Sequence, residues 1–110
     1  MATIQEFQAL DLRVGTVVQA QPFPEARKPS IKMVIDFGSE LGLKSSSAQI
    51  TMHYSPETLV GRQVVAVVNF PERRIAGFAS QVLVLGAMVQ PHEVVLLCLD
   101  SPVPNGARIG

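Results

Sequence analysis

The hydrophobic pattern of the chain is densest over residues 61–87, where two runs of mainly β-branched residues flank one polar loop. The runs cover residues 64–68 and 82–85, and the loop between them carries Arg73 and Arg74. β-Branched residues suit a pleated, buried surface, so both runs predict strands. The first run is apolar on both faces, which predicts a tightly closed barrel with further cover outside it, supplied by a second subunit.

Alternating apolar positions and turn residues along the rest of the chain predict further strands and two short helices. Strands are predicted over residues 13–20, 31–37, 44–51, 63–69 and 81–87, with one more over residues 93–99. Thr3 and Glu6 have the spacing of a capping box, which predicts a short N-terminal helix. Ser55 followed by Pro56 predicts a second helix, which Gly61 ends.

Three strands, a helix and two strands, in this order, are typical of the OB-fold, an all-β, five-stranded Greek-key barrel. We therefore predict one domain over residues 1–110, with the N-terminal helix and the last strand as extensions of the barrel. Gly15 in the first strand predicts a bulge or a coiling of the strand, which a small barrel needs in order to turn. Asn105 and Gly106 predict a tight turn near the C-terminus.

The basic residues gather where this fold binds its ligands, although nine Lys and Arg residues balance nine Asp and Glu residues overall. OB-folds bind on strands 2 and 3, between the loop joining strands 1 and 2 and the loop joining strands 4 and 5. Glu25 and Glu72 interrupt the cluster, and ordinary solvation of polar loops is the alternative interpretation. The predicted nucleic-acid contacts are Arg27, Lys28, Lys32, Lys44, Arg73 and Arg74.

A second ligand class, extended polypeptide, is predicted from the serine-rich third strand and from apolar residues in the loops. If this strand lies at a sheet edge, a peptide could pair with it through main-chain hydrogen bonds, while loop side chains supply apolar contacts. Met33 shares the apolar phase of its strand and is predicted to be core. The predicted peptide contacts are Phe23, Ser45, Ser46, Ser47, Gln49 and Phe78.

Catalysis, metal binding and cofactor binding are not predicted. The serines at 45–47, with His53 and Asp36, lack the Gly-x-Ser-x-Gly elbow of a hydrolase. His53 and His92 lie far apart in the sequence, and Cys98 has no neighbour at ligand spacing. Cys98 lies in an apolar run and is predicted to be a small buried hydrophobe.

Location in the cytoplasm is predicted from several absences. The single cysteine excludes an internal disulfide framework, which fits a reducing compartment. The first residues, MATIQEF, have neither the basic nor the apolar region of a signal peptide. No apolar run approaches the roughly 18 residues that span a bilayer, so no membrane insertion is expected.

Five segments of the chain form a specific combination: RVGTVVQAQPFPEARKPS, KSSSAQIT, YSPETLVGRQVVAVVNF, RRIAGFASQVLVLGA and PVPNGARIG. In these segments the chain resembles the CsaA-type secretion chaperones of the tRNA-binding-domain OB-fold family. The tRNA-binding relatives carry other residues after strands 1 and 3 and near strand 5, so the chaperone subgroup fits better. The resemblance implies a chaperone for unfolded or export-bound polypeptides, and the alternative is a structure-specific tRNA-binding protein.

The resemblance also implies a homodimer that pairs through both ends of the chain. The predicted dimerisation extensions are residues 1–11 and 88–110. Ile4, Phe7 and Leu10 fall on one face of the N-terminal helix, and this apolar stripe is predicted to pack on a second subunit or, alternatively, on the end of its own barrel. The predicted interface residues are Ile4, Phe7, Leu10, Val95 and Leu97.

Overall fold

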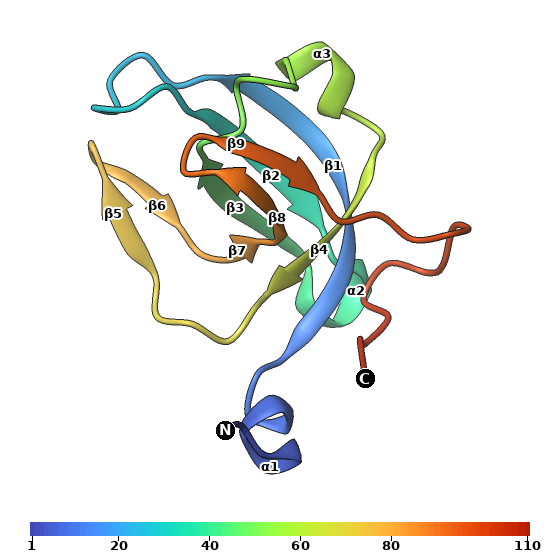
Figure 1. Ribbon diagram of the computed structural model, residues 1–110. Helices are drawn as coiled ribbons and strands as arrows, with labels where there is room; N and C mark the ends of the chain where they lie inside the picture. The colour runs from blue at the N-terminus through green and yellow to red at the C-terminus, as the bar shows by residue number, and fades with distance from the viewer.

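The fold is an antiparallel barrel of five strands in the order β3-β2-β1-β4-β7, described over residues 1–110 by a computed structural model (Figure 1). The strands are β1 (Leu12–Pro22), β2 (Ile31–Asp36), β3 (Leu43–Ala48), β4 (Gln63–Val67) and β7 (Leu83–Val84). Two hairpins flank the sheet, β5 (Arg73–Ile75) with β6 (Phe78–Ser80), and β8 (Gly86–Gln90) with β9 (Glu93–Leu96). The helices are α1 (Ile4–Gln8), α2 (Gly38–Leu41) and α3 (Pro56–Leu59).

The element order confirms the OB-fold prediction, because α3 lies between β3 and β4 and the two edges of the sheet come together. The Gln81 amide donates to the Ser45 carbonyl at 2.8 Å. The buried Ser46 hydroxyl donates to the Val82 carbonyl at 2.9 Å. These bonds connect β3 to the segment that leads into β7, so the barrel is nearly closed.

Local sequence signals explain β2 and α3. The predicted alternation of β2 is confirmed, since Ile31, Met33 and Ile35 are buried and the residues between them are half-buried. Ser55 and Thr58 form a capping box at the start of α3, after which Leu59 is fully buried in the main core.

The polar loop between the two apolar runs forms a β-hairpin, which was not predicted from the sequence. Residues 73–75 and 78–80 pair as the β5–β6 hairpin around a two-residue turn. Ala76 and Gly77 both have positive φ in this turn, as type I′ geometry requires. The single strand predicted over residues 81–87 is divided between β7 and β8, and residues 97–99 lie outside β9.

Both faces of β4 are covered within the chain. Val64 and Ala66 belong to the main core, and Val65 and Val67 form a second cluster with Leu12. The second cluster is packed by Leu10, Leu85, Leu99 and Ile109. The inference that a second subunit covers this strand is therefore wrong, because residues of the same chain, including Leu99 and Ile109 of the C-terminal segment, provide the cover.

Hydrogen bonds to β1 hold the C-terminal segment in this position. Ile109 donates its amide to the Leu12 carbonyl at 2.9 Å, and Gly106 donates to the Val14 carbonyl at 2.7 Å. The turn predicted at Asn105 and Gly106 is confirmed, with Gly106 at φ +91°. The segment after residue 100 therefore packs against β1 of its own chain.

Gly15 does not form the predicted bulge, which lies between Val17 and Gln19 instead. A Cβ atom at Gly15 would come within 2.6 Å of Ile35 Cγ2 and 2.8 Å of the Phe37 ring. Both neighbours are fully buried, so the glycine provides the space that the Phe37 ring occupies.

The substitution Gly15→Ala is expected to destabilise the fold by about 1–3 kcal/mol through overpacking of this core. Urea unfolding of the variant measures the change, with Gly110→Ala as the control, since a Cβ there meets no atom within 4 Å. Equal unfolding midpoints for Gly15→Ala and the control would show that the core accommodates the added methyl group without a loss of stability.

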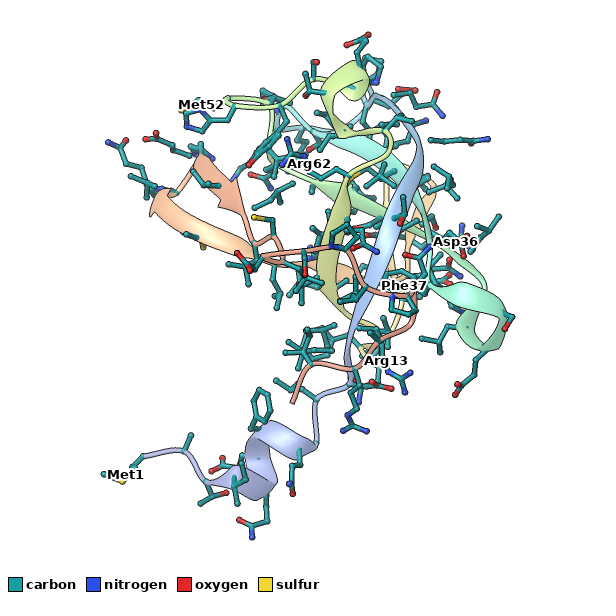
Figure 2. The ribbon with its side chains drawn as sticks, turned by 90° about the vertical axis from the view of Figure 1, so that its right-hand side faces the viewer. Met1, Arg13, Asp36, Phe37, Met52 and Arg62 are labelled. Atoms are coloured by element: carbon teal, nitrogen blue, oxygen red, sulfur yellow. The ribbon has the colours of Figure 1, made fainter.

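Helix α1 and the β8–β9 hairpin extend away from the barrel. Figure 2 shows α1 standing apart at the start of β1, and none of its residues is buried. Its predicted capping box is confirmed, with Thr3 and Glu6 bonding each other's amides. The β9 strand is anchored where the Leu96 amide donates to the Tyr54 hydroxyl at 2.9 Å.

Cys98 follows β9 and is exposed, so the prediction of a buried residue is wrong. The apolar run that suggested burial ends on the outer surface after β9. No helix of the structure has the length and apolarity needed to cross a membrane.

Candidate ligand-binding groove

A groove of about 740 Å³ opens between the β1–β2 loop and the β5–β6 hairpin. Figure 1 shows this loop and this hairpin reaching out on the same side of the barrel. One wall is formed by residues 25–28, a second by residues 73–76 and a third by residues 47–50 at the end of β3. The fourth side comes from β7 and the β8–β9 hairpin.

Four of the six predicted cationic contacts lie together in this groove. Arg27 and Lys28 come from the β1–β2 loop, and Arg73 and Arg74 come from β5. All four side chains are exposed. The OB-fold topology therefore gathers cations that are about 45 positions apart in the sequence.

Three of these four cations have no counterion in the molecule. Arg74 Nη2 lies 3.5 Å from Glu72 Oε2, and Arg74 Nη1 donates to the Gly77 carbonyl. Arg27, Lys28 and Arg73 form no ion pair in the structure. Glu25 is the acidic residue on the groove wall, so the positive charge exceeds the negative charge there.

Apolar side chains line the groove outside the β1–β2 loop, and few of them were predicted from the sequence. Leu83 is 46% exposed, which leaves much of its side chain available to a ligand. No aromatic residue lines the groove. The run over residues 82–85 is apolar on both faces of the strand, and this pattern could have predicted that Leu83 presents an apolar side chain on the outer face. The larger apolar lining residues outside the loop are Ile50, Ile75, Leu83, Val84, Leu85, Met88 and Val94.

The serine-rich strand does not offer the free edge on which its predicted peptide contacts depended. The Ser45 hydroxyl donates to the Ala79 carbonyl at 2.6 Å, and the Ser47 amide donates to Ser80 Oγ at 3.0 Å. Ser46 is only 1% exposed. The edge is occupied because these serines close the barrel against residues 79–82. Of the six predicted peptide contacts, Ser47 and Gln49 line the groove.

Phe23 and Phe78 lie behind the groove wall instead of inside the groove. Phe23 is 4% exposed, so the prediction that it presents an apolar surface in a loop is wrong. Phe78 is half-buried in β6. Lys32 and Lys44 also lie outside the groove lining, on β2 and β3.

One ion pair has a clear electrostatic effect, and it lies outside the groove. Arg13 Nε donates to Asp11 Oδ1 at 2.6 Å, and this hydrogen bond raises the pKa of Arg13 above its usual value. A raised pKa keeps the guanidinium charged at every pH at which the protein folds. The pair therefore connects Asp11 to Arg13 at the start of β1.

Comparison with known families agrees with the geometry of the groove. The model of the tRNA binding domain family matches residues 12–108. The chain belongs to the tRNA-binding-domain family. The match covers the barrel and the C-terminal segment, so the groove lies within the part of the chain that defines the family.

Solved structures of this family share the whole fold of the chain. The crystal structure of chaperone CsaA from Bacillus anthracis has 56% identity and a TM-score of 0.95, covering 100% of this chain and 99% of that chain. The CsaA chaperone protein from Picrophilus torridus has 44% identity and a TM-score of 0.92, with both chains fully covered. These similarities confirm the resemblance to CsaA chaperones.

Curated relatives in the family are much longer. The methionine–tRNA ligase of Thermotoga maritima is 35% identical over 107 residues, which are 97% of this chain and 16% of the ligase. The ligase of Chlorobium chlorochromatii is 43% identical over 107 residues, 15% of its length. The chain thus corresponds to a small part of these ligases.

Proposed function

We propose that the protein is a homodimeric chaperone that holds unfolded or export-bound polypeptides in the groove. The observation that carries this proposal is the chemistry of the lining, where aliphatic side chains open to solvent beside three uncompensated cations. Similarity to two CsaA chaperones over the full chain supports the same function. A binding role in the cytoplasm, without a chemical step or a cofactor, is part of the proposal.

The lining suits a polypeptide better than a base-stacked nucleic acid. Single-stranded nucleic acids gain much of their affinity from stacking of bases on aromatic side chains, and the groove has none. Aliphatic residues such as Leu83 and Met88 provide contacts that many different apolar side chains can fill, which a chaperone with varied clients requires. A volume of 740 Å³ accommodates a segment of a few residues.

An aggregation assay tests this proposal. The purified protein is added to a chemically unfolded secretory preprotein during dilution from denaturant, and light scattering is followed. Suppression of scattering at near-stoichiometric amounts of chaperone is the expected result. Unchanged scattering, together with no binding of extended peptides by fluorescence anisotropy, would exclude the chaperone function.

Binding of tRNA is the second candidate, because the chain belongs to the tRNA-binding-domain family and the cations converge on one surface. The four groove cations would contact phosphates, which gives affinity without base readout. Competition decides how the two functions relate. If tRNA displaces a preprotein peptide from the dimer, one groove serves both ligands, and if it does not, the sites are separate.

The dimer is proposed to form through α1 and the β8–β9 hairpin. Both elements carry apolar side chains that the single chain leaves in solvent: Ile4 is 61% exposed, Phe7 39%, Val95 43% and Leu97 43%. Leu10 is half-buried and packs on the chain's own second cluster, so it contributes less to the proposed interface. The interface also includes Val89 on β8, whose side chain is 61% exposed and does not line the groove.

The double substitution Phe7→Asp/Val95→Asp is expected to convert the dimer to a monomer at micromolar concentration, because it places charges in an apolar interface. Sedimentation velocity measures the change, and Leu43→Asp is the control because Leu43 is exposed on β3. A monomeric wild-type protein, or a double variant that remains dimeric, would contradict the proposed interface.

A further inference from the structure

A cation–π cluster joins the two cationic walls of the groove. Lys32 Nζ lies 5.0 Å from the centroid of the Phe23 ring and 5.5 Å from that of Phe78. The two rings meet edge to face, with centroids 5.5 Å apart and planes inclined at 69°. Both distances from the ammonium group are within the range of an attractive cation–π interaction.

The two aromatic rings are the only interaction partners of the Lys32 ammonium group in the structure. Its side chain forms neither a hydrogen bond nor an ion pair within the chain, and it is half-buried on β2. It is also absent from the lining of the groove. The two rings are therefore its structural partners, and the position predicted from sequence to contact phosphate has a role inside the protein.

Phe23 anchors the wall formed by the β1–β2 loop. Its ring is buried, its amide donates to the Ser30 carbonyl at 3.1 Å, and its carbonyl accepts from the Ala26 amide at 3.2 Å. The Ser30 hydroxyl donates to the Lys28 carbonyl at 2.8 Å. These hydrogen bonds connect the loop that carries Arg27 and Lys28 to the backbone of Phe23, whose ring is buried.

Phe78 lies in the hairpin that forms the second wall, β5–β6. It pairs with Ile75 across the two-residue turn of the β5–β6 hairpin, next to Arg74. The opposite end of β6 is fixed to β3 through Ala79 and Ser80. Contact with Lys32 and Phe23 provides a further attachment close to the hairpin tip, where a free hairpin would be most mobile.

We propose that Lys32 is a positioning residue for the ligand groove. Its ammonium group holds the Phe23 and Phe78 rings together and so sets the spacing between the walls that carry Arg27 and Arg73. This inference rests on the proposed function for its consequence in ligand binding, whereas the cluster itself is tested in the protein without ligand.

The test compares Lys32→Met, Lys32→Arg and the matched control Lys44→Met, which removes a half-buried cation from the neighbouring strand. In Lys32→Met the amides of Ile75 and Phe78 are expected to exchange hydrogen about 3- to 10-fold faster, at conditions where urea unfolding shows all variants folded. Arginine also binds aromatic faces, so Lys32→Arg should restore slow exchange. The Lys32 ε-methylene protons of the wild type should resonate upfield because they are next to the ammonium group that lies over the rings.

Peptide binding separates this inference from the proposed function. Lys32→Met is expected to bind an extended preprotein peptide about 3-fold more weakly, while Lys44→Met binds it as the wild type does. Unchanged exchange at Ile75 and Phe78 in Lys32→Met would overturn the positioning role, as would a tRNA salt-dependence slope reduced by about one, the result expected of a direct phosphate contact. If the wild-type protein does not bind the peptide, the chaperone function is rejected, whereas the positioning role of Lys32 is still tested by the exchange measurement.

Discussion

The double substitution Arg27→Gln/Arg73→Gln is expected to weaken tRNA binding at least roughly 10-fold at low salt and to lower the slope of log K against log salt by about 1.5–2. Both side chains line the groove from opposite walls, and neither has a counterion to satisfy in the folded chain. Their removal should therefore reduce phosphate contacts without a loss of stability. Filter binding across a salt series measures the slope.

A matched control makes this result specific to the groove. Lys44→Gln together with Arg62→Gln also removes two cations, but both residues lie outside the groove lining. The control is expected to retain nearly the wild-type slope. Equal losses in the two double variants would show that tRNA responds to general charge and not to the groove.

The substitution Leu83→Asp is expected to weaken binding of an extended apolar peptide by roughly 10- to 30-fold, because it places a charge within the aliphatic part of the groove. Leu83 is 46% exposed in β7, so the carboxylate reaches water in the free protein and the fold should tolerate it. Fluorescence anisotropy of a labelled preprotein peptide gives the affinity, and light scattering gives the chaperone activity.

Leu43→Asp is the control for this change, since Leu43 is 62% exposed on β3 and does not line the groove. Its peptide affinity should equal that of the wild type. If Leu83→Asp binds the peptide as tightly as the control does, then the aliphatic lining is not the contact surface for clients.

Local sequence signals predicted the parts of the fold that depend on neighbouring residues. The alternation in β2 depends only on which face of one strand is buried, and it was confirmed at Ile31, Met33 and Ile35. The capping box at Thr3 was confirmed for the same reason, because both of its bonds lie within four residues. The topology then followed from element order, and this brought Arg27 and Arg73 to one groove.

Features that depend on non-local pairing were missed. The serines of β3 appeared free because nothing near them in sequence shows that residues 79–82, about 35 positions later, occupy their edge. Phe23 was predicted to be exposed because of its position in a loop, although Phe78 and Lys32 complete a site for its ring. Apolar cover on β4 was attributed to a partner because the C-terminal segment carries few signs that it folds back.

Mapping of amide chemical shifts during titration with an unfolded preprotein peptide tests the central claim most directly, namely that this groove holds the ligand. The largest shift changes are expected at residues 25–28, 73–76 and 83–88, with little change at α2. Changes concentrated on α2 and the outer face of β1, with the groove signals unmoved, would contradict it.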